Sequence, residues 1–193
     1  MIRVTGGHLR GRLLKTPPGE ITRPALSRVR LAVFNILAPQ VPGSRFLDLF
    51  GGSGAYAIEA LSRGAEQATI VELNRTAARF IQTNIENLGL KEQARLILGD
   101  ALRVVPALAG HGLKYDIIAV APPHFAGLVS GALHRLDEYP ELLDDAGTVF
   151  VQHHRDEPVP ASLDNFASGR TYVYGITRVT ILSQSSARGL PAQ

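Results

Sequence analysis

The sequence predicts an α/β fold in which a mostly parallel sheet of seven strands carries helices on both faces and has its last strand antiparallel. Two patterns indicate this arrangement. Between residues 45 and 153, short apolar runs alternate with helical segments, as they do where helical crossovers join parallel strands. Residues 170–174 and 177–182 are β-branched and aromatic runs separated only by Gly175-Ile176, a hairpin spacing that makes the final strand antiparallel.

A small basic arm precedes this domain. Residues 2–5 and 12–15 are expected to pair as a β-hairpin, which Pro17-Pro18-Gly19 ends. A helix is expected from Ser27, because apolar residues recur on one face until Pro39 stops it. The chain therefore divides into an arm (1–22), an α/β domain (23–183) and a small polar tail expected to be disordered (184–193).

Hydrophobic runs and periodicity give the remaining elements. The expected strands before the hairpin are residues 45–49, 68–72, 95–98, 115–120 and 148–153. The expected helices are residues 55–62, 75–88, 101–108 and 128–136. Gly89 ends the longest of these helices, and Asp144-Asp145-Ala146-Gly147 predicts a turn before the strand at 148.

Composition excludes several classes of protein. The chain has 193 residues, 45% hydrophobic and 19% charged, so one domain with a real core is expected. No apolar run approaches the roughly 18–20 residues of a membrane span, and the N-terminus lacks the apolar region of a signal peptide. The absence of cysteine excludes disulfides and thiolate metal sites. We therefore expect a monomeric cytoplasmic protein without a membrane or metal partner.

Charge is concentrated at the N-terminus. The whole chain is only +3, yet residues 1–30 hold seven Lys or Arg against Glu20 alone. Nearly all the basic residues are arginine, whose planar fork suits phosphates and stacked bases. A basic arm on a nearly neutral body is typical of nucleic-acid binding, the alternative being a solvated terminus without a partner.

The segment Phe46-Leu-Asp-Leu-Phe-Gly-Gly-Ser-Gly54 carries the strongest functional signal. An apolar strand reaches Asp48 and breaks into a glycine-rich turn that opens a helix, so a ligand can approach bare backbone and helix N–H groups. The pattern G-x-G-x-x-A with Glu72 close to the roughly 20-residue spacing also fits a dinucleotide site. A carboxylate before the glycines would repel a pyrophosphate but attract the sulfonium and ammonium of S-adenosylmethionine (SAM). With Glu72 for a ribose and Asp100 for an adenine, the pattern favours SAM.

A second motif follows the strand at 115–120. The loop Ala121-Pro-Pro-His-Phe125 resembles the Asp/Asn/Ser-Pro-Pro-Tyr/Phe motif of methyltransferases that act on exocyclic amino groups of nucleobases. Before it stand the arm Arg3-Val-Thr-Gly-Gly-His-Leu-Arg-Gly-Arg12 and the segment 23–37, which contains Arg28-Val-Arg30 and Phe34-Asn35. In this order the parts are similar to the RsmD family of 16S ribosomal RNA guanine-N2 methyltransferases, over about residues 2–155.

The resemblance implies a Rossmann-like class I methyltransferase fold and a set of site residues. The cofactor-binding residues would be Ser27, Arg30, Asn35, Asp48, Phe50, Gly51, Gly52, Ser53, Gly54, Glu72, Leu73, Asp100 and Ala101. The catalytic loop would be Ala121, Pro122, Pro123 and His124, which orients a flipped-out guanine. The RNA-binding residues would be Arg3, His8, Arg10, Arg12, Lys15, Arg23, Arg28 and Phe125. The implied partner is 16S rRNA or an assembling small ribosomal subunit.

The loop departs from the family motif at two positions. Ala121 has no side-chain acceptor for the target amino group, and His124 replaces the aromatic ring on which the base stacks, although Phe125 can take that role. Three alternatives therefore stay open: a catalytically silent relative that binds SAM and RNA, a methyltransferase for another nucleic-acid amino group or a small molecule, and an NAD-dependent oxidoreductase. His153-His154 with Asp156 and Glu157 lacks a recognised ligand spacing, so no metal site is expected.

Overall fold

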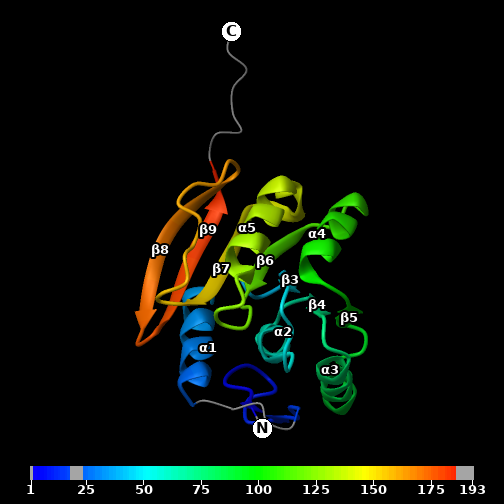
Figure 1. Cartoon of the computed structure of the whole chain (residues 1–193). Coiled ribbons are helices and arrows are strands. Elements are labelled where there is room, and N and C mark those ends of the chain that lie inside the picture. Colours follow the sequence, from blue (N-terminus) through cyan, green and yellow to red (C-terminus); the bar gives the residue numbers. More distant parts are fainter. Residues whose placement is uncertain (1, 18–23, 186–193) are drawn as a thin grey trace.

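The computed structural model describes residues 2–17 and 24–185, with side chains from Ser27 onward in the second range. Figure 1 shows an α/β domain whose sheet has the strand order β5-β4-β3-β6-β7-β9-β8. The strands of this sheet are β3 (Arg45–Asp48), β4 (Gln67–Glu72), β5 (Ala94–Leu98), β6 (Tyr115–Val120), β7 (Leu143–His154), β8 (Phe166–Tyr174) and β9 (Thr177–Gln184). The helices are α1 (Pro24–Ile36), α2 (Ala55–Ser62), α3 (Arg75–Leu88), α4 (Ala101–Gly110), α5 (Leu128–Glu138) and the short 3₁₀ helix η1 (Pro140–Leu142).

The central strands pair in parallel, and β9 runs antiparallel to both β7 and β8. This confirms the predicted seven-stranded sheet whose last strand is antiparallel. The central strands β3, β4 and β6 are largely apolar and buried, as expected where helices cover both faces of a sheet. Phe46 and Ile117 point into the core beneath α1, α2 and α3, whereas Leu47 and Ile118 point into the core beneath α4 and α5.

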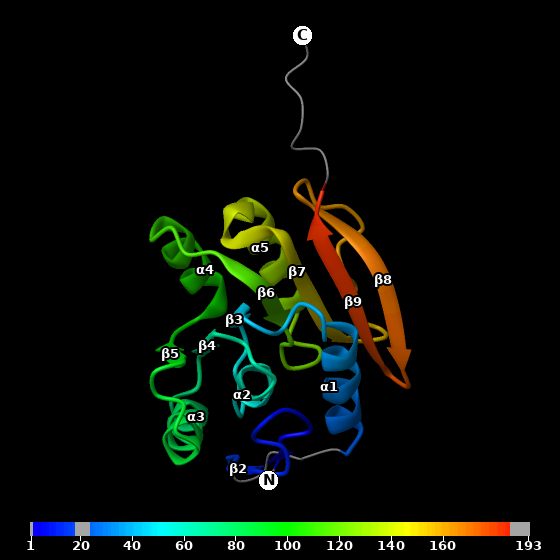
Figure 2. The same cartoon turned by 180° about the vertical axis from the view of Figure 1, so that it is seen from behind.

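The N-terminal arm forms the predicted hairpin, β1 (Ile2–Arg3) with β2 (Leu13–Leu14), and packs against the domain. Val4, Leu9 and Leu14 are at most 8% exposed and belong to the α1–α3 core. Figures 1 and 2 place the arm beneath the layer formed by α1, α2 and α3, between α1 and α3. The arm is therefore part of the folded domain, which disfavours the alternative of a solvated terminus.

Two strands, β7 and β8, begin four or more residues before their predicted starts. The segment Asp144–Gly147, predicted as a turn, lies inside β7, where the pairing with β6 shifts register between Tyr115↔Leu143 and Ile117↔Thr148. Turn-forming residues are tolerated there because the ladder is interrupted. β8 begins at Phe166 because β9 offers backbone partners as far as Gln184, although Ala167, Ser168 and Gly169 have no strand preference.

β9 includes Gln184, the first residue of the predicted tail. Its side chain donates hydrogen bonds to the carbonyl oxygens of Pro140 (3.0 Å) and Leu143 (2.9 Å), which ties the end of the strand to the start of β7. The rest of the predicted tail, from residue 186, lies outside the described residues, so its predicted disorder stays a prediction. Among the described residues, no helix is long and apolar enough to cross a membrane.

Candidate cofactor and acceptor site

Parallel pairing brings the predicted site segments to one edge of the sheet. Asp48 is the last residue of β3, Glu72 the last of β4, and Asp100 follows β5. The acceptor loop 121–125 follows β6, which neighbours β3 on the other side. Since the order is β5-β4-β3-β6, three acidic residues and the acceptor loop lie next to one another at the carboxyl ends, where ligands bind in open α/β sheets.

Asp48 is a buried carboxylate with an unsatisfied oxygen. It is 1% exposed; its Oδ1 accepts a 3.3 Å hydrogen bond from the N–H of Phe50, and its Oδ2 has no partner. Burial raises the pKa of Asp48 to about 7, against the lowering effect of the N–H groups of Phe50 and Ala57. The negative charge of Glu72 raises this pKa further. A cation bound beside this buried oxygen would stabilise the ionised carboxylate, which has no other partner there.

The glycines of the loop meet packing and backbone requirements. A Cβ at Gly51 would come within 2.6 Å of Ile70 Cγ2, so this glycine makes room for core side chains. Gly52 and Gly54 adopt φ of 54° and 76°, which glycine reaches without strain. Gly54 is also the residue from which α2 starts.

Glu72 fixes this loop from the neighbouring strand. Its Oε2 accepts a hydrogen bond from the N–H of Gly52 (2.7 Å) and its Oε1 accepts one from the N–H of Asn74 (2.7 Å). Leu73 beside it is 71% exposed. Asp100 caps α4 by accepting from the N–H of Leu102 (2.8 Å), with Ala101 buried behind it.

The donor set fits SAM better than a dinucleotide. SAM is cationic near its sulfonium and amino groups, and the orphaned Oδ2 of Asp48 can accept from such a group. A pyrophosphate placed on the same loop would face a carboxyl that burial already disfavours as an anion, and its own negative charge would raise the cost further. The residues therefore disfavour the NAD-dependent alternative.

Three of the predicted cofactor contacts lie on α1. Ser27 is half-buried and Asn35 is exposed. Arg30 is 4% exposed and engaged elsewhere: its Nε lies 3.4 Å from Glu59 Oε2, and its guanidinium donates a 2.7 Å bond to the carbonyl of Arg3. Arg30 thus ties α1 to α2 and the arm.

The acceptor loop turns sharply after β6. Pro122 is buried, Pro123 is exposed, and Ala121 and His124 are half-buried. Phe125 has φ of 60° and is 66% exposed. Its ring centroid lies 4.5 Å from that of His154 at the end of β7, and the His124 ring lies 5.6 Å from the same histidine. Aromatic surface is therefore present beside the loop despite the change at position 124.

The predicted RNA-binding side chains that the structure describes are exposed to solvent. Arg3, His8, Arg10, Arg12, Lys15 and Arg28 are all exposed, and Phe125 is as well. Arg23 lies outside the described residues. Arg3 donates to the carbonyl of Gly11 (2.7 Å), and a ring nitrogen of His8 lies 3.0 Å from the carbonyl oxygen of Ser62. These contacts brace the hairpin and still leave the side chains on the surface.

Two buried polar residues that sequence reasoning missed hold the arm in place. Glu59 on α2 is fully buried and accepts from the N–H and hydroxyl of Thr5, both at 2.7 Å, and from Nε of Arg63 at 2.9 Å. Asn84 on α3 bonds both main-chain groups of Lys15 (2.8 and 2.9 Å) and donates to the carbonyl of Ser53 (3.3 Å). Asn84 therefore joins the arm to the glycine loop. The sequence shows that each is a polar residue within a predicted helix, but it does not show which distant residue binds it.

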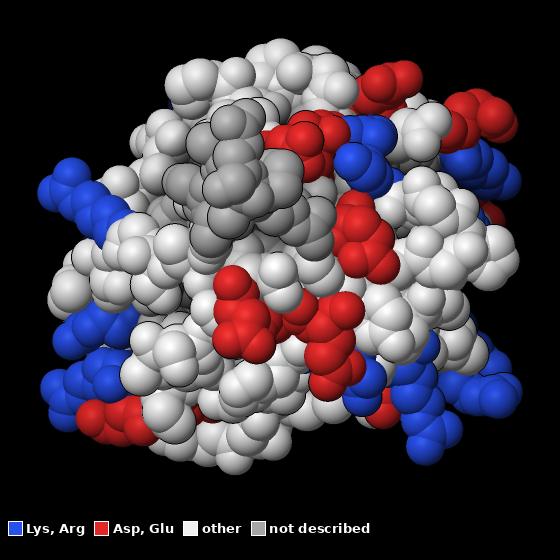
Figure 3. Space-filling model, turned by 90° about the horizontal axis from the view of Figure 1, so that it is seen from above, with Lys and Arg blue, Asp and Glu red and all other residues white. Residues whose placement is uncertain are grey.

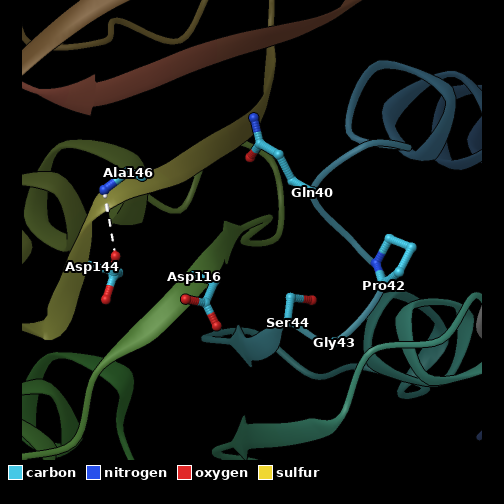
Figure 4. Close-up of a pocket in the computed structure, with 7 residues that line it drawn as sticks. All are labelled: Gln40, Pro42, Gly43, Ser44, Asp116, Asp144 and Ala146. Atoms are coloured by element: carbon cyan, nitrogen blue, oxygen red, sulfur yellow. Dashed lines mark hydrogen bonds between the residues drawn. The ribbon is translucent and has the colours of Figure 1, made fainter.

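A pocket of about 310 Å³ lies elsewhere, at the amino ends of the strands (Figure 4). Ser44, Asp116 and Asp144 line it, and Arg45 binds both acids at 2.8 and 3.2 Å. This ion pair lowers the pKa of Asp116. Figure 3, seen from above, shows acidic side chains near the middle of that face of the molecule. The pocket is thus separate from the carboxyl-edge site.

The described residues, 2–17 and 24–185, were the ones in which a metal site could be sought. There, no group of three or more His, Asp or Glu side chains is arranged to hold a metal ion. His153 lies 3.2 Å from the hydroxyl of Thr180, and His154 faces Phe125. Both histidines therefore have local partners.

Comparisons with known proteins agree with this geometry. The family model described as "Conserved hypothetical protein 95" matches residues 2–183. The Escherichia coli K12 protein named Ribosomal RNA small subunit methyltransferase D is 34% identical over 174 residues, covering 90% of this chain and 85% of the relative. The Haemophilus influenzae protein of the same name is 34% identical over 161 residues, covering 82% and 81%.

Solved structures give the same result. A hypothetical protein of Thermus thermophilus is 30% identical with a TM-score of 0.81, covering 95% of this chain and 99% of that one. A SAM-dependent methyltransferase from Agrobacterium tumefaciens is 19% identical with a TM-score of 0.62, covering 84% and 63%, which shows a common fold. The fold is the Rossmann-like fold of SAM-dependent methyltransferases, and the chain belongs to the RsmD family of ribosomal RNA small subunit methyltransferases.

Proposed function

We propose that this protein transfers a methyl group from SAM to the exocyclic N2 of a guanine in 16S rRNA of the small ribosomal subunit, acting in the cytoplasm. The observation that carries the proposal is the juxtaposition at one sheet edge. A buried carboxylate with an unpaired oxygen, Asp48, ends the strand next to the one that leads into the Ala-Pro-Pro-His loop. The exposed basic arm packs against α2 and α3, and its Lys15 is linked through Asn84 to the carbonyl of Ser53 in the glycine loop.

SAM supplies a methyl group activated by its positively charged sulfur. The residues proposed to hold it each have a separate task. Asp48 accepts from the amino group, Glu72 from the ribose hydroxyls, and Asp100 with Ala101 contacts the adenine. Glu72 keeps lone pairs for this purpose, because each of its oxygens accepts one main-chain hydrogen bond in the structure.

The acceptor loop has to make a poor nucleophile reactive. The lone pair of a guanine amino nitrogen is delocalised into the ring. Acceptors that hold its two hydrogens draw it towards tetrahedral geometry, and its proton can leave after the methyl is attached. With alanine at position 121, main-chain carbonyls of residues 121–124 are the acceptors that the loop offers. Phe125, 66% exposed, offers a ring for the flipped-out base.

The arm supplies RNA affinity. Arg10, Arg12 and Lys15 are exposed on a hairpin that Glu59 and Asn84 hold rigidly. Phosphate contacts of this kind position an RNA without reading its sequence. Prepositioned arginines lose less conformational freedom on binding than a loose terminus does.

A second candidate rests on the side chain missing at position 121. Losing one preorganised polar contact costs ~10²–10³ in rate in related transition-state sites. A protein that binds SAM and rRNA without transferring the methyl group is consistent with Ala121 and with the intact cofactor side. The two candidates make opposite predictions for methyl incorporation.

Methyl incorporation from labelled SAM tests the proposal. The substrates are small subunits from cells lacking their native guanine-N2 methylation, fully methylated small subunits, and large subunits. The proposal expects incorporation only into the first. Equal incorporation into large subunits would contradict the assignment to small-subunit RNA. No incorporation, with SAM and RNA binding both measurable, would favour the silent relative.

A further inference from the structure

The conformation of Phe125 is the least expected feature of the acceptor loop. Among described residues other than glycine, Phe125 alone has a positive φ, 60°. A large side chain costs about 1–3 kcal/mol in such a region and keeps it only where the surroundings impose it. Something outside the loop must therefore hold this residue.

The holding group is Glu157, which follows β7 in the chain. Its carboxylate is only 8% exposed and accepts from two main-chain N–H groups, Phe125 at 2.6 Å through Oε1 and His154 at 2.9 Å through Oε2. One buried side chain thus joins the acceptor loop to the end of β7, 32 residues further along the chain. Hydrogen bonds from a carboxylate to main-chain N–H groups are of the stronger, charge-assisted kind.

The consequence concerns the Phe125 ring. With the backbone held, the ring stands out from the surface yet rests on His154, at 4.5 Å between centroids and 51° between planes. A pocket of about 240 Å³ opens beside it, lined by Phe125, Gly127, Val129, Ser130, Asp156, Glu157 and Pro158. The ring is thereby offered to a planar group from outside, which is how proteins hold unstacked RNA bases.

We propose that Glu157 is a positioning residue of methyl transfer: it holds Phe125 in its left-handed conformation, so that Phe125, backed by His154, forms the stacking surface for the target base. This surface replaces the aromatic residue that His124 has displaced from the fourth loop position. The inference rests on the proposed function, because the stacked group is the methyl-accepting base. Glu157 itself touches no substrate in this account.

A double-mutant cycle tests it. Glu157→Ala removes both hydrogen bonds, and Phe125→Ala removes the ring. We expect each single variant to lower kcat/KM for small subunits about 10–100-fold, the range for a small misplacement of reacting groups, with SAM affinity within about twofold. Because Glu157 acts through Phe125, the double variant should be no slower than Phe125→Ala alone. If Glu157→Ala instead lowered activity by destabilising the fold, its loss of kcat/KM would add to that of Phe125→Ala in the double variant.

Two further measurements keep the outcomes distinct. Glu141→Ala removes an exposed carboxylate from η1 and should match the wild type. Amide exchange of residues 121–127 tests the clamp whatever the substrate is, and should accelerate at least about tenfold in Glu157→Ala. Unchanged exchange, unchanged kcat/KM, or additive losses in the cycle would each overturn the inference. A wild type that methylates no ribosomal RNA would instead overturn the proposed function.

Discussion

At the scale of single residues, Asp48 connects burial, protonation and cofactor binding. Its carboxyl is 1% exposed, one of its oxygens has no partner, and its pKa is raised to about 7. In the folded protein it stays protonated over a pH range in which the unfolded chain has already released the proton. Folding stability is therefore lost as pH rises from 3.8 to about 7, and does not fall further from this source above that.

The first prediction is that SAM binding below pH 7 releases a proton from Asp48. A cation beside the unpaired oxygen favours the ionised form, so affinity should increase with pH up to about 7, by at most about tenfold per unit. Titration calorimetry in buffers of different ionisation enthalpy measures the released proton.

Asp48→Asn is the matched variant, since it keeps the shape and cannot ionise. It should be more stable than the wild type at pH 8, equally stable below pH 3.8, bind SAM at least about tenfold more weakly, and release no proton. If this variant releases as many protons on SAM binding as the wild type does, the proton comes from a group other than Asp48.

The second prediction concerns Ala121. If the missing side-chain acceptor limits the reaction, Ala121→Asp or Ala121→Asn should raise kcat on small subunits, at most ~10²-fold by analogy with transition-state donors, with SAM affinity unchanged. Single-turnover rates measure this directly. An unchanged or lower rate in both variants would show that main-chain acceptors already suffice.

At the scale of elements, the arm depends on a very close backbone approach. The N–H of His8 donates to the carbonyl of Ser62 at 2.8 Å, and a Cβ on Gly7 would overlap that carbonyl. Gly11, in the same hairpin, also has a positive φ, 88°, but open space around it. The pair separates the effect of close approach from that of backbone strain.

The third prediction is that Gly7→Ala detaches the arm from α2. Amide exchange in residues 2–17 should accelerate and affinity for small-subunit RNA should fall several-fold, while SAM affinity stays the same. Gly11→Ala adds only local strain, about 1 kcal/mol, and should retain most of the RNA affinity. Equal losses in the two variants would mean that docking on Ser62 does not matter.

The elements show which parts of the fold the sequence can predict. Helices 55–62 and 75–88 and strand 115–120 have the predicted bounds, because hydrophobic period and terminal glycines act locally. β7 and β8 extend further because their ends are set by partner strands. Glu59, Asn84 and Glu157 were missed as structural residues for the same reason: their partners lie 54, 69 and 32 residues away in sequence.

At the scale of the whole molecule, exposed basic side chains are concentrated on the arm. Arg3, Arg10, Arg12 and Lys15 are exposed on the arm, which lies at the bottom of Figure 1, whereas the face seen from above in Figure 3 has acidic side chains near its middle and basic ones around them. This distribution favours approach of RNA with its phosphates towards the arm. It also explains how a chain of only +3 can carry a nucleic-acid surface.

The fourth prediction is that the arm sets the salt dependence of RNA binding. Arg10→Gln with Arg12→Gln should weaken binding and reduce the slope of log affinity against log salt by roughly 0.7–0.9 for each phosphate that the arm no longer neutralises. Lys91→Gln with Lys114→Gln removes the same charge at the amino ends of β5 and β6 and should leave the slope unchanged. Equal slopes for the two double variants would contradict a localised RNA surface.

The most direct test of the central claim is the identity of the methylated nucleoside. Small subunits lacking native guanine-N2 methylation are incubated with the protein and isotopically labelled SAM, and their RNA is digested to nucleosides for mass spectrometry. If the protein methylates guanine N2 of 16S rRNA, the digest contains labelled N2-methylguanosine and no other labelled nucleoside. Labelled N6-methyladenosine would contradict it, and so would the absence of any labelled methylguanosine when SAM and RNA binding are both measured.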